Sequence, residues 1–117
     1  MKSLDDGGVT NDTIVIFYSD NGGVGNFERE GLTWGGRSPT DNYPLRGGKG
    51  MLYEGGIRVP LIVRWPGVIR PHSLCRQPVI STNFFPTLID VAGAQAPRTP
   101  LDGMSMAALW RSSGRAP

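Results

Sequence analysis

The 117 residues would suffice for one small domain, but 17 glycines and 10 prolines approach the level at which loops replace packed helices and sheets. The charges, 12 Lys and Arg against 10 Asp and Glu, give a net charge of +2 and are scattered, which argues against nucleic acid as a partner. The single cysteine excludes an intrachain disulfide and a cysteine-rich zinc site, and no apolar run approaches the roughly 20 residues that a membrane helix needs.

The first half of the chain predicts the end of a helix, a strand and a long loop. Residues 2–9 are expected to end a helix at a pair of glycines. A continuous run of β-branched and aromatic residues over 13–19 is typical of a strand that is buried on both faces, as in a parallel sheet. From 20 to 58 this pattern gives way to Gly, Pro, Asn, Asp and Ser, which indicates one long loop.

The second half predicts a strand followed by two helices. The strand covers 59–65 and ends at a Pro-Gly pair, and residues 78–81 allow a further short strand. Residues 83–92 predict a helix that has apolar side chains near one face, a proline in its first turn and a glycine at its end. The apolar piece at 104–110 predicts a last short helix.

These elements predict an α/β fold that residues 1–117 do not complete. Strands that are buried on both faces need neighbouring strands and covering helices, and the chain offers only a few short helices. Loops longer than about 15 residues are also uncommon inside a compact domain. We therefore expect 1–117 to be a single incomplete segment of a larger domain, whose missing layers lie upstream.

Two neighbouring polar residues directly after the first strand are candidate metal ligands. In open α/β sheets, ligands bind beyond the carboxyl ends of the strands, where the carboxylate of Asp20 and the amide of Asn21 would lie. Their hard oxygen atoms suit Ca²⁺ or Mg²⁺, and the glycines that follow let the backbone turn away. The same residues also fit an ordinary turn, and two ligands do not fill the roughly six to eight positions around calcium.

A glycine-rich stretch around Lys49 is a candidate anion site. A cation among glycines lets backbone amides and an ammonium group approach an oxyanion together, which suits sulfate or phosphate. The stretch from 45 to 50 is not a Walker loop, because the required spacing of glycines, lysine and serine or threonine is not met. A flexible surface loop with a solvated lysine is the alternative interpretation.

Other polar and aromatic residues receive no catalytic role. Glu54 and Arg58 are expected to pair with each other or with the backbone. His72 has no second histidine or carboxylate nearby in the sequence that would make it a base or a ligand, so we expect it at the surface. Three tryptophans are assigned to packing: Trp34, Trp65 and Trp110.

Several segments of the chain follow one another in a distinctive order. They are Thr-Ile-Val-Ile-Phe-Tyr-Ser-Asp-Asn-Gly-Gly (13–23), Pro-Leu-Arg-Gly-Gly-Lys-Gly-Met-Leu-Tyr-Glu-Gly-Gly-Ile-Arg-Val-Pro (44–60), Trp-Pro-Gly (65–67), Phe-Phe-Pro-Thr-Leu-Ile-Asp-Val-Ala-Gly (84–93) and Leu-Asp-Gly (101–103). Taken in this order, they resemble the sulfatase family, of the arylsulfatase type. The block at 44–60 is very specific, and the resemblance covers nearly the whole chain. Order and spacing are similar to the part of a sulfatase's main catalytic domain that lies downstream of its nucleophile.

The resemblance implies part of an alkaline-phosphatase-like α/β sandwich, with buried, mostly parallel strands, flanking helices and a long active-site loop. It implies a sulfate ester substrate, a calcium ion, sometimes magnesium, bound by Asp20 and Asn21, and a sulfate group contacted by Lys49. These roles agree with the chemistry of the residues themselves, because a metal ion and an ammonium group both neutralise charge on the sulfuryl oxygens. A periplasmic, extracellular or lysosomal location is also implied, although the Met1 end lacks the apolar stretch of a secretory signal.

The family's nucleophile is a formylglycine made from the cysteine of a Cys-x-Pro/Ala-x-Arg motif, and Cys75 does not match this motif. The residues that follow it are Arg-Gln-Pro-Val, so both the Pro/Ala position and the Arg position fail. We therefore expect formylglycine elsewhere in the parent protein, an inactive isolated chain, and a fold that needs the remainder of the sulfatase domain. The alternatives are a phosphonate or phosphate ester hydrolase of the same superfamily and a non-catalytic anion-binding relic.

Overall fold

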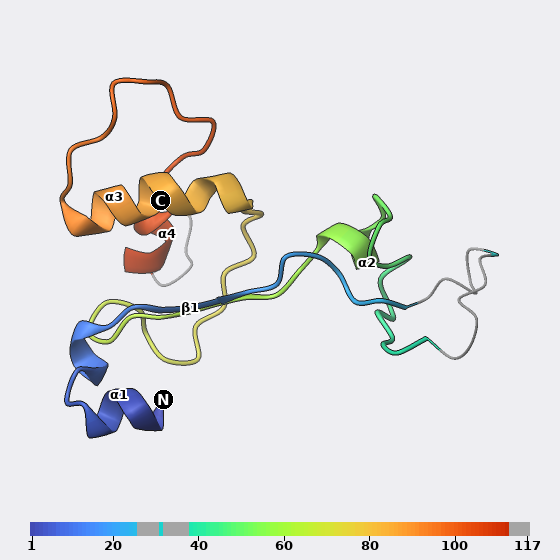
Figure 1. The fold of residues 1–117 in the computed structure, drawn as a ribbon, viewed down its shortest axis with the longest axis horizontal. Helices are drawn as coiled ribbons and strands as arrows, with labels where there is room; N and C mark the ends of the chain where they lie inside the picture. The colour runs from blue at the N-terminus through green and yellow to red at the C-terminus, as the bar shows by residue number, and fades with distance from the viewer. Residues whose placement is uncertain (26–30, 32–37, 113–117) are drawn as a thin grey trace. The chain divides into compact units, whose positions relative to one another are not determined.

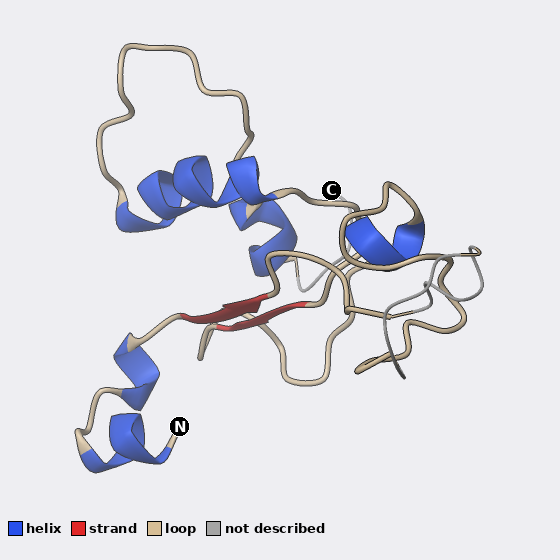
Figure 2. Cartoon of the chain, turned by 45° about the vertical axis from the view of Figure 1, so that its right-hand side comes forward, coloured by secondary structure: helices blue, strands red, loops and turns tan. Residues whose placement is uncertain are grey.

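The computed structural model describes residues 1–25, 31 and 38–112, which Figure 1 shows as a ribbon. The chain divides into two compact units: a strand unit, Val15–Val63, and a helical unit made of Met1–Ile14 and Arg64–Pro117. Within the described ranges, no helix is both long enough and apolar enough to cross a membrane. Short helices and a small sheet, joined by loops, give the α/β content that the sequence predicts (Figure 2).

The sheet consists of two strands, β1 (Val15–Tyr18) and β2 (Leu61–Arg64). Past the end of β1, the backbone N–H of Ser19 donates to the carbonyl oxygen of Pro60 at 3.3 Å, and that of Gly22 donates to the carbonyl oxygen of Gly56 at 2.9 Å. The residue number rises along one segment while it falls along the other, so the pairing is antiparallel. The residues that follow β1 therefore lie beside those that precede β2.

The strands are shorter and less buried than the sequence predicts. The apolar runs at 13–19 and 59–65 each contain a strand of only 4 residues. Phe17 is 58% exposed and Ile62 is 62% exposed, so each strand keeps a large apolar side chain that the described residues leave uncovered. The predicted parallel arrangement is not found for this pair either. A continuous apolar run indicates a strand that other layers can cover, but an antiparallel strand inside a mixed sheet is covered in the same way, so the run does not fix strand direction.

A short helix, α2 (Glu54–Ile57), lies inside the stretch that the sequence predicts as one loop from 20 to 58. The sequence hides this helix because its two central glycines are poor helix formers. The guanidinium group of Arg58 donates to the carboxylate of Glu54 at 3.0 Å, one helical turn away. The expected pairing of these two exposed side chains is therefore confirmed. The other described residues of this stretch, up to Tyr53, form neither helix nor strand.

The helical unit contains α1 (Lys2–Asp6), the 3-10 turns η1 (Thr10–Asp12) and η3 (Ser81–Asn83), α3 (Phe84–Ala92) and α4 (Ala107–Arg111). Gly93, with φ at 61°, ends α3 as predicted, because this left-handed conformation costs glycine little. The strand allowed at 78–81 does not form. The backbone N–H of Ile80 instead donates to the side-chain oxygen of Asn83 at 2.8 Å, a local bond that favours the turn η3 over an extended strand.

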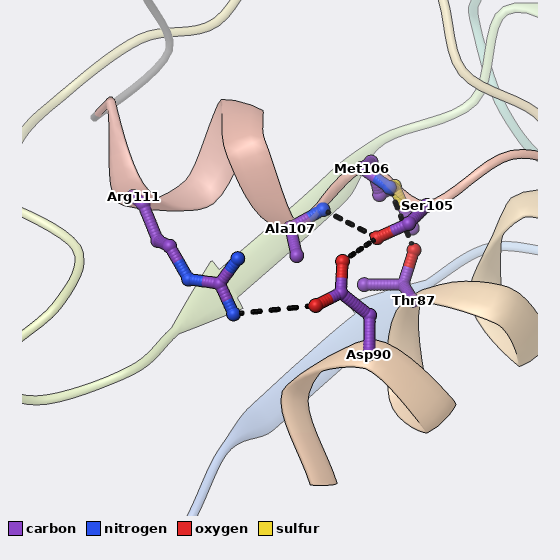
Figure 3. Close-up of polar contacts among 6 residues, drawn as sticks. All are labelled: Thr87, Asp90, Ser105, Met106, Ala107 and Arg111. Atoms are coloured by element: carbon purple, nitrogen blue, oxygen red, sulfur yellow. Dashed lines mark hydrogen bonds and ion pairs between the residues drawn. The ribbon is translucent and has the colours of Figure 1, made fainter. Parts of the chain in front are cut away.

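A buried hydroxyl group joins α3 to the segment that leads into α4. Oγ1 of the fully buried Thr87 donates to the carbonyl oxygen of Asn83 at 2.6 Å and accepts the backbone N–H of Met106 at 2.9 Å. Figure 3 shows Thr87 on α3 facing the turn before α4. The hydroxyl thus satisfies a buried backbone N–H that would otherwise lack a partner.

The tryptophans that the structure describes pack within the helical unit. Trp110 on α4 is buried, and its ring meets that of Trp65 edge to face, with the ring centroids 6.1 Å apart. This contact confirms a packing role for both residues. Trp34 lies outside the described residues.

An exposed acidic side chain adds a second polar connection between α3 and α4. Oγ of Ser105 donates to Oδ2 of Asp90 at 2.5 Å, and Nη2 of Arg111 lies 3.4 Å from Oδ1 (Figure 3). The hydrogen bond from Ser105 is the largest influence and lowers the pKa of Asp90 below its ordinary value of 3.8; desolvation opposes it and the charge of Arg111 supports it. Asp90 therefore favours its ionised form when α4 is packed.

Candidate functional site

Asp20 and Asn21 follow directly on the end of β1, as the sequence predicts. Oγ of Ser19 donates to the carbonyl oxygen of Asn21 at 2.9 Å, and the backbone N–H of Gly22 donates to the carbonyl oxygen of Gly56 at 2.9 Å. These two bonds hold the turn on both sides of the candidate ligands. Asp20 is exposed and Asn21 is half-buried, so the carboxylate is accessible while the amide is held in the turn.

The amide group of Asn21 is bonded through its nitrogen. Nδ2 donates to the carbonyl oxygen of Gly22 at 3.0 Å. This bond uses the donor side of the amide, whereas a metal ion would bind its oxygen atom. Together with the carboxylate of Asp20 it offers hard oxygen atoms of the kind that Ca²⁺ and Mg²⁺ prefer.

Asp20 and Asn21 remain the candidate metal ligands of this chain. Among the described residues, no group of three or more His, Cys, Asp and Glu side chains gathers to hold a metal ion. Asp20 and Asn21 offer two candidate oxygen ligands, whereas a calcium shell needs roughly six to eight oxygens.

Lys49 lies in a tight turn whose backbone is fixed although its side chain is exposed. The backbone N–H of Met51 donates to the carbonyl oxygen of Gly48 at 3.0 Å, which closes the turn around Lys49. The backbone N–H of Lys49 itself donates to the carbonyl oxygen of Gly23 at 3.0 Å. Gly23 comes two positions after Asn21, so this bond joins the lysine segment to the segment of the candidate metal ligands.

Glycines from separate parts of the strand unit pack backbone against backbone around this bond. A Cβ atom on Gly22 would fall on the carbonyl oxygen of Gly55, and one on Gly48 would meet the carbonyl oxygens of Gly23 and Gly25. Gly22 and Gly48 are buried, so a larger residue at either position requires the backbone to move. Glycines that the sequence indicates as turn residues thus also permit the close approach of these segments.

Asn42 is a residue of this site that sequence reasoning missed. Its side-chain nitrogen Nδ2 donates to the carbonyl oxygen of Gly23 at 2.9 Å and to that of Gly47 at 3.1 Å. In the sequence Asn42 stands between Asp41 and Tyr43-Pro44, where it fits an ordinary turn. Its place beside the block at 44–60 was the only signal that could have drawn attention to it.

Other polar residues of the chain make contacts of their own or are exposed, and we assign them no place in the candidate site. The guanidinium group of Arg46 stacks 3.8 Å above the ring of Tyr53, the residue that precedes α2. This cation–π contact fixes the start of the turn around Lys49, called the lysine turn below. Glu54 and Arg58 are occupied with each other. His72 and Cys75 are exposed residues of the helical unit, as expected for His72.

Known proteins are similar to this chain in sequence and in backbone structure. A family model described as Sulfatase matches residues 1–94. A protein named Sulfatase from Formosa agariphila is 44% identical over 112 residues, which make up 92% of this chain and 18% of that protein. Human Arylsulfatase A is 38% identical over 117 residues, which make up 100% of this chain and 21% of that protein. Mouse Steryl-sulfatase is 36% identical over 117 residues, which make up 98% of this chain and 18% of that protein.

The similarity extends to a solved structure. The crystal structure of Ps i-CgsB in complex with k-i-k-neocarrahexaose superposes with a TM-score of 0.79 and 29% sequence identity, over 96% of this chain and 23% of that one. The chain thus spans about a fifth of the length of the curated relatives it matches. The backbone of this chain follows that of a larger protein over nearly all of its own length.

Proposed function

The chain belongs to the sulfatase family, and we propose that the enzyme containing it hydrolyses sulfuric esters with Asp20 and Asn21 as metal ligands and Lys49 as a contact of the sulfate group. Sulfatases belong to the alkaline-phosphatase-like superfamily and are metal-dependent hydrolases. Since the chain spans about a fifth of its relatives, the remaining ligands and catalytic groups would come from the rest of the catalytic domain.

One observation carries this proposal: the hydrogen bond of 3.0 Å from the backbone N–H of Lys49 to the carbonyl oxygen of Gly23. It brings the backbone of Lys49 next to the segment that carries Asp20 and Asn21. A carboxylate, an amide oxygen and an ammonium group on adjoining segments suit a site in which a metal ion and a lysine share one anion.

Each side chain has a distinct chemical task in this proposal. A Ca²⁺ ion, or Mg²⁺ in its place, would supply positive charge beside the sulfuryl oxygens when bound to Asp20 and Asn21. The ammonium group of Lys49 would donate hydrogen bonds to the sulfate group and stabilise the charge that grows on its oxygens as the ester bond breaks. The hydrogen bond from Nδ2 of Asn21 to the carbonyl oxygen of Gly22 supports this task, because it uses the amide nitrogen and not the amide oxygen.

The nucleophile would lie outside this chain. We propose a formylglycine made from a cysteine in a Cys-x-Pro/Ala-x-Arg motif elsewhere in the enzyme, because Cys75 lacks that context. The curated relatives described above are named as sulfatases, which favours sulfate over phosphate or phosphonate esters and an enzyme over a relic.

The fold proposed for the whole domain is the alkaline-phosphatase-like sandwich. In it, β1 and β2 would lie inside a larger, mostly parallel sheet with helices on both faces. The exposed side chains of Phe17 and Ile62 support this proposal, because they are the apolar surface that such layers would cover.

Replacement of Asp20 in the full-length enzyme tests the metal site. Asp20→Ala should weaken Ca²⁺ binding at least about tenfold by isothermal titration and lower the hydrolysis of 4-nitrophenyl sulfate at limiting calcium. Asp6→Ala, at an exposed position of α1, is the matched control and should change neither quantity. Unchanged calcium affinity of Asp20→Ala would remove this residue from the metal site.

A further inference from the structure

The side-chain amide of Asn42 bonds to both segments of the candidate site. Its Nδ2 donates to the carbonyl oxygen of Gly23 at 2.9 Å and to that of Gly47 at 3.1 Å. Gly23 follows Asn21 by two positions, and Gly47 precedes Lys49 by two positions. One half-buried amide group is therefore bonded both to the segment that carries Asp20 and Asn21, called the metal-ligand segment below, and to the lysine turn. In each case the bond lies two positions from a candidate site residue.

The carbonyl oxygen of Gly23 is the shared point of this arrangement. It accepts both the side-chain N–H of Asn42 and the backbone N–H of Lys49, at 2.9 and 3.0 Å. Carbonyl oxygens have two lone pairs, so both bonds can form together. Any shift of Asn42 that moves Gly23 or Gly47 therefore also moves the backbone of Lys49, and with it the Cα atom that carries the lysine side chain.

The surroundings of Asn42 leave little room for a different arrangement. A Cβ atom on Gly23 would press on the side-chain oxygen of Asn42, and one on Gly48 would come within 3.0 Å of its nitrogen. The backbone carbonyl of Asn42 also accepts the N–H of Leu45 at 2.8 Å, which anchors the residue itself. The amide is thus packed between glycine backbones that have no side chains to replace its bonds.

We propose that Asn42 is a positioning residue that holds Lys49 in register with the Asp20-Asn21 segment, through the two hydrogen bonds of its side-chain amide. This inference rests on the proposed function, because it assigns Asn42 to the same site. It differs from a purely structural role in that Asn42 acts through Lys49: the loss of Asn42 should matter only while the lysine side chain is present.

The chemistry of the amide group explains why asparagine is suited to this position. Its NH₂ carries two N–H bonds, one for each carbonyl oxygen. Aspartate has nearly the same shape but offers only acceptor atoms at neutral pH, so both carbonyl oxygens would face a negative charge. Asn42→Asp therefore reverses the polarity of the group with little change in volume, which makes it the most informative replacement.

A double-mutant cycle in the full-length enzyme tests the proposal. The variants are Asn42→Asp, Lys49→Ala and the combination of both, with Asn11→Asp as the matched control, because Asn11 is exposed in η1 of the helical unit. Two quantities are measured: kcat for 4-nitrophenyl sulfate and the inhibition constant for inorganic sulfate. The inhibition constant does not depend on how much of the enzyme is folded, so a structural loss alone leaves it unchanged.

Each single variant should lower kcat and weaken sulfate binding at least about tenfold, the order expected for a displaced anion contact. The combined variant should be no more than about threefold worse than Lys49→Ala alone, because residues that act through one another are not additive. Asn11→Asp should match the unaltered enzyme. If Asn42→Asp does not fold, Asn42→Ser, which keeps one donor, takes its place in the same cycle and should show the same lack of additivity.

Two different results overturn two different claims. Full additivity, or an unchanged inhibition constant in the Asn42 variants, would overturn the positioning role while leaving Lys49 in the active site. Unchanged kcat and sulfate binding in Lys49→Ala would instead overturn the role of Lys49 in the proposed function, and with it the positioning role of Asn42.

Discussion

The backbone N–H of Lys49 lies 3.0 Å from the carbonyl oxygen of Gly23 and donates a hydrogen bond to it. The bond spans two stretches of sequence that resemble different motifs of the family, one with the candidate metal ligands and one with the candidate sulfate contact. It exists because buried glycines let the two backbones meet without intervening side chains.

Lys49→Ala tests the sulfate contact. In the full-length enzyme this variant should lower the turnover of 4-nitrophenyl sulfate at least about tenfold, the order of an oxyanion-stabilising contact, without a change in the thermal unfolding midpoint. Lys2 is the only other lysine of the chain, and it is exposed in α1, so Lys2→Ala is the matched control. Turnover equal to that of Lys2→Ala would exclude Lys49 from the site.

Gly48→Ala tests the close backbone packing. The added methyl group would meet the carbonyl oxygens of Gly23 and Gly25, so the lysine turn must move away from the metal-ligand segment. Turnover should fall at least about tenfold, because a displacement of about 1 Å at a catalytic group can cost more than that.

The control for Gly48→Ala is a glycine in open space. Among the described residues other than its chain neighbours, none has an atom within 4 Å of the ideal Cβ position of Gly8, although its φ of +68° disfavours alanine. Gly8→Ala should therefore cost only about 1 kcal/mol of unfolding free energy from backbone strain and leave turnover unchanged. Equal losses of turnover in both variants would argue against a special role for the packing at Gly48.

Thr87→Val tests the buried hydroxyl between α3 and α4. Valine has nearly the same shape but removes the acceptor for the backbone N–H of Met106, which would then be buried without a partner. The unfolding free energy of the region should fall by about 1–3 kcal/mol, measured as faster amide hydrogen exchange in α4.

Thr82 provides the comparison for Thr87, because it is an exposed threonine in η3. Thr82→Val should change the unfolding free energy by less than about 0.5 kcal/mol, the usual range for surface positions. Exchange in α4 that is as slow in Thr87→Val as in Thr82→Val would show that the hydroxyl is not needed there.

The connection of Ser105 to Asp90 predicts a pH-dependent contribution to stability. Because folding lowers the pKa of Asp90, chiefly through the hydrogen bond from Ser105, the ionised carboxylate stabilises the folded state. This contribution is present above the ordinary pKa of 3.8 and is lost as the pH falls through the lower pKa of the folded state. Ser105→Ala should therefore lower the thermal unfolding midpoint at pH 6 and have a smaller effect at pH 3.

The same measurement on Ser112→Ala controls for the loss of a serine hydroxyl, because the Oγ of Ser112 donates to a neutral group, the backbone carbonyl oxygen of Leu109, at 3.1 Å. Its effect should not shrink between pH 6 and pH 3. An effect of Ser105→Ala that stays constant or grows as the pH falls would contradict the proposed influence on Asp90.

The order of elements followed from the sequence, but strand direction and burial did not. The helix α3 was predictable from its apolar face and its terminal Gly93, whose signals are local. The pairing of β1 with β2 is antiparallel because of backbone contacts between residues such as Ser19 and Pro60, which no local pattern specifies. The helix α2 was missed because its two glycines locally disfavour a helix, whereas packing in the folded chain stabilises it.

The sequence alone determined which chemical groups the site can use: the oxygens of Asp20 and Asn21, the ammonium group of Lys49, and no nucleophile motif at Cys75. It also carried enough of the family's motifs to predict the sulfatase family, which the comparisons confirm. Only the tertiary structure showed that Lys49 is bonded to Gly23 and that Asn42 bonds to the backbone on both sides. The physical reason is that residue types set which bonds are possible, whereas the approach of distant backbones decides which of them form.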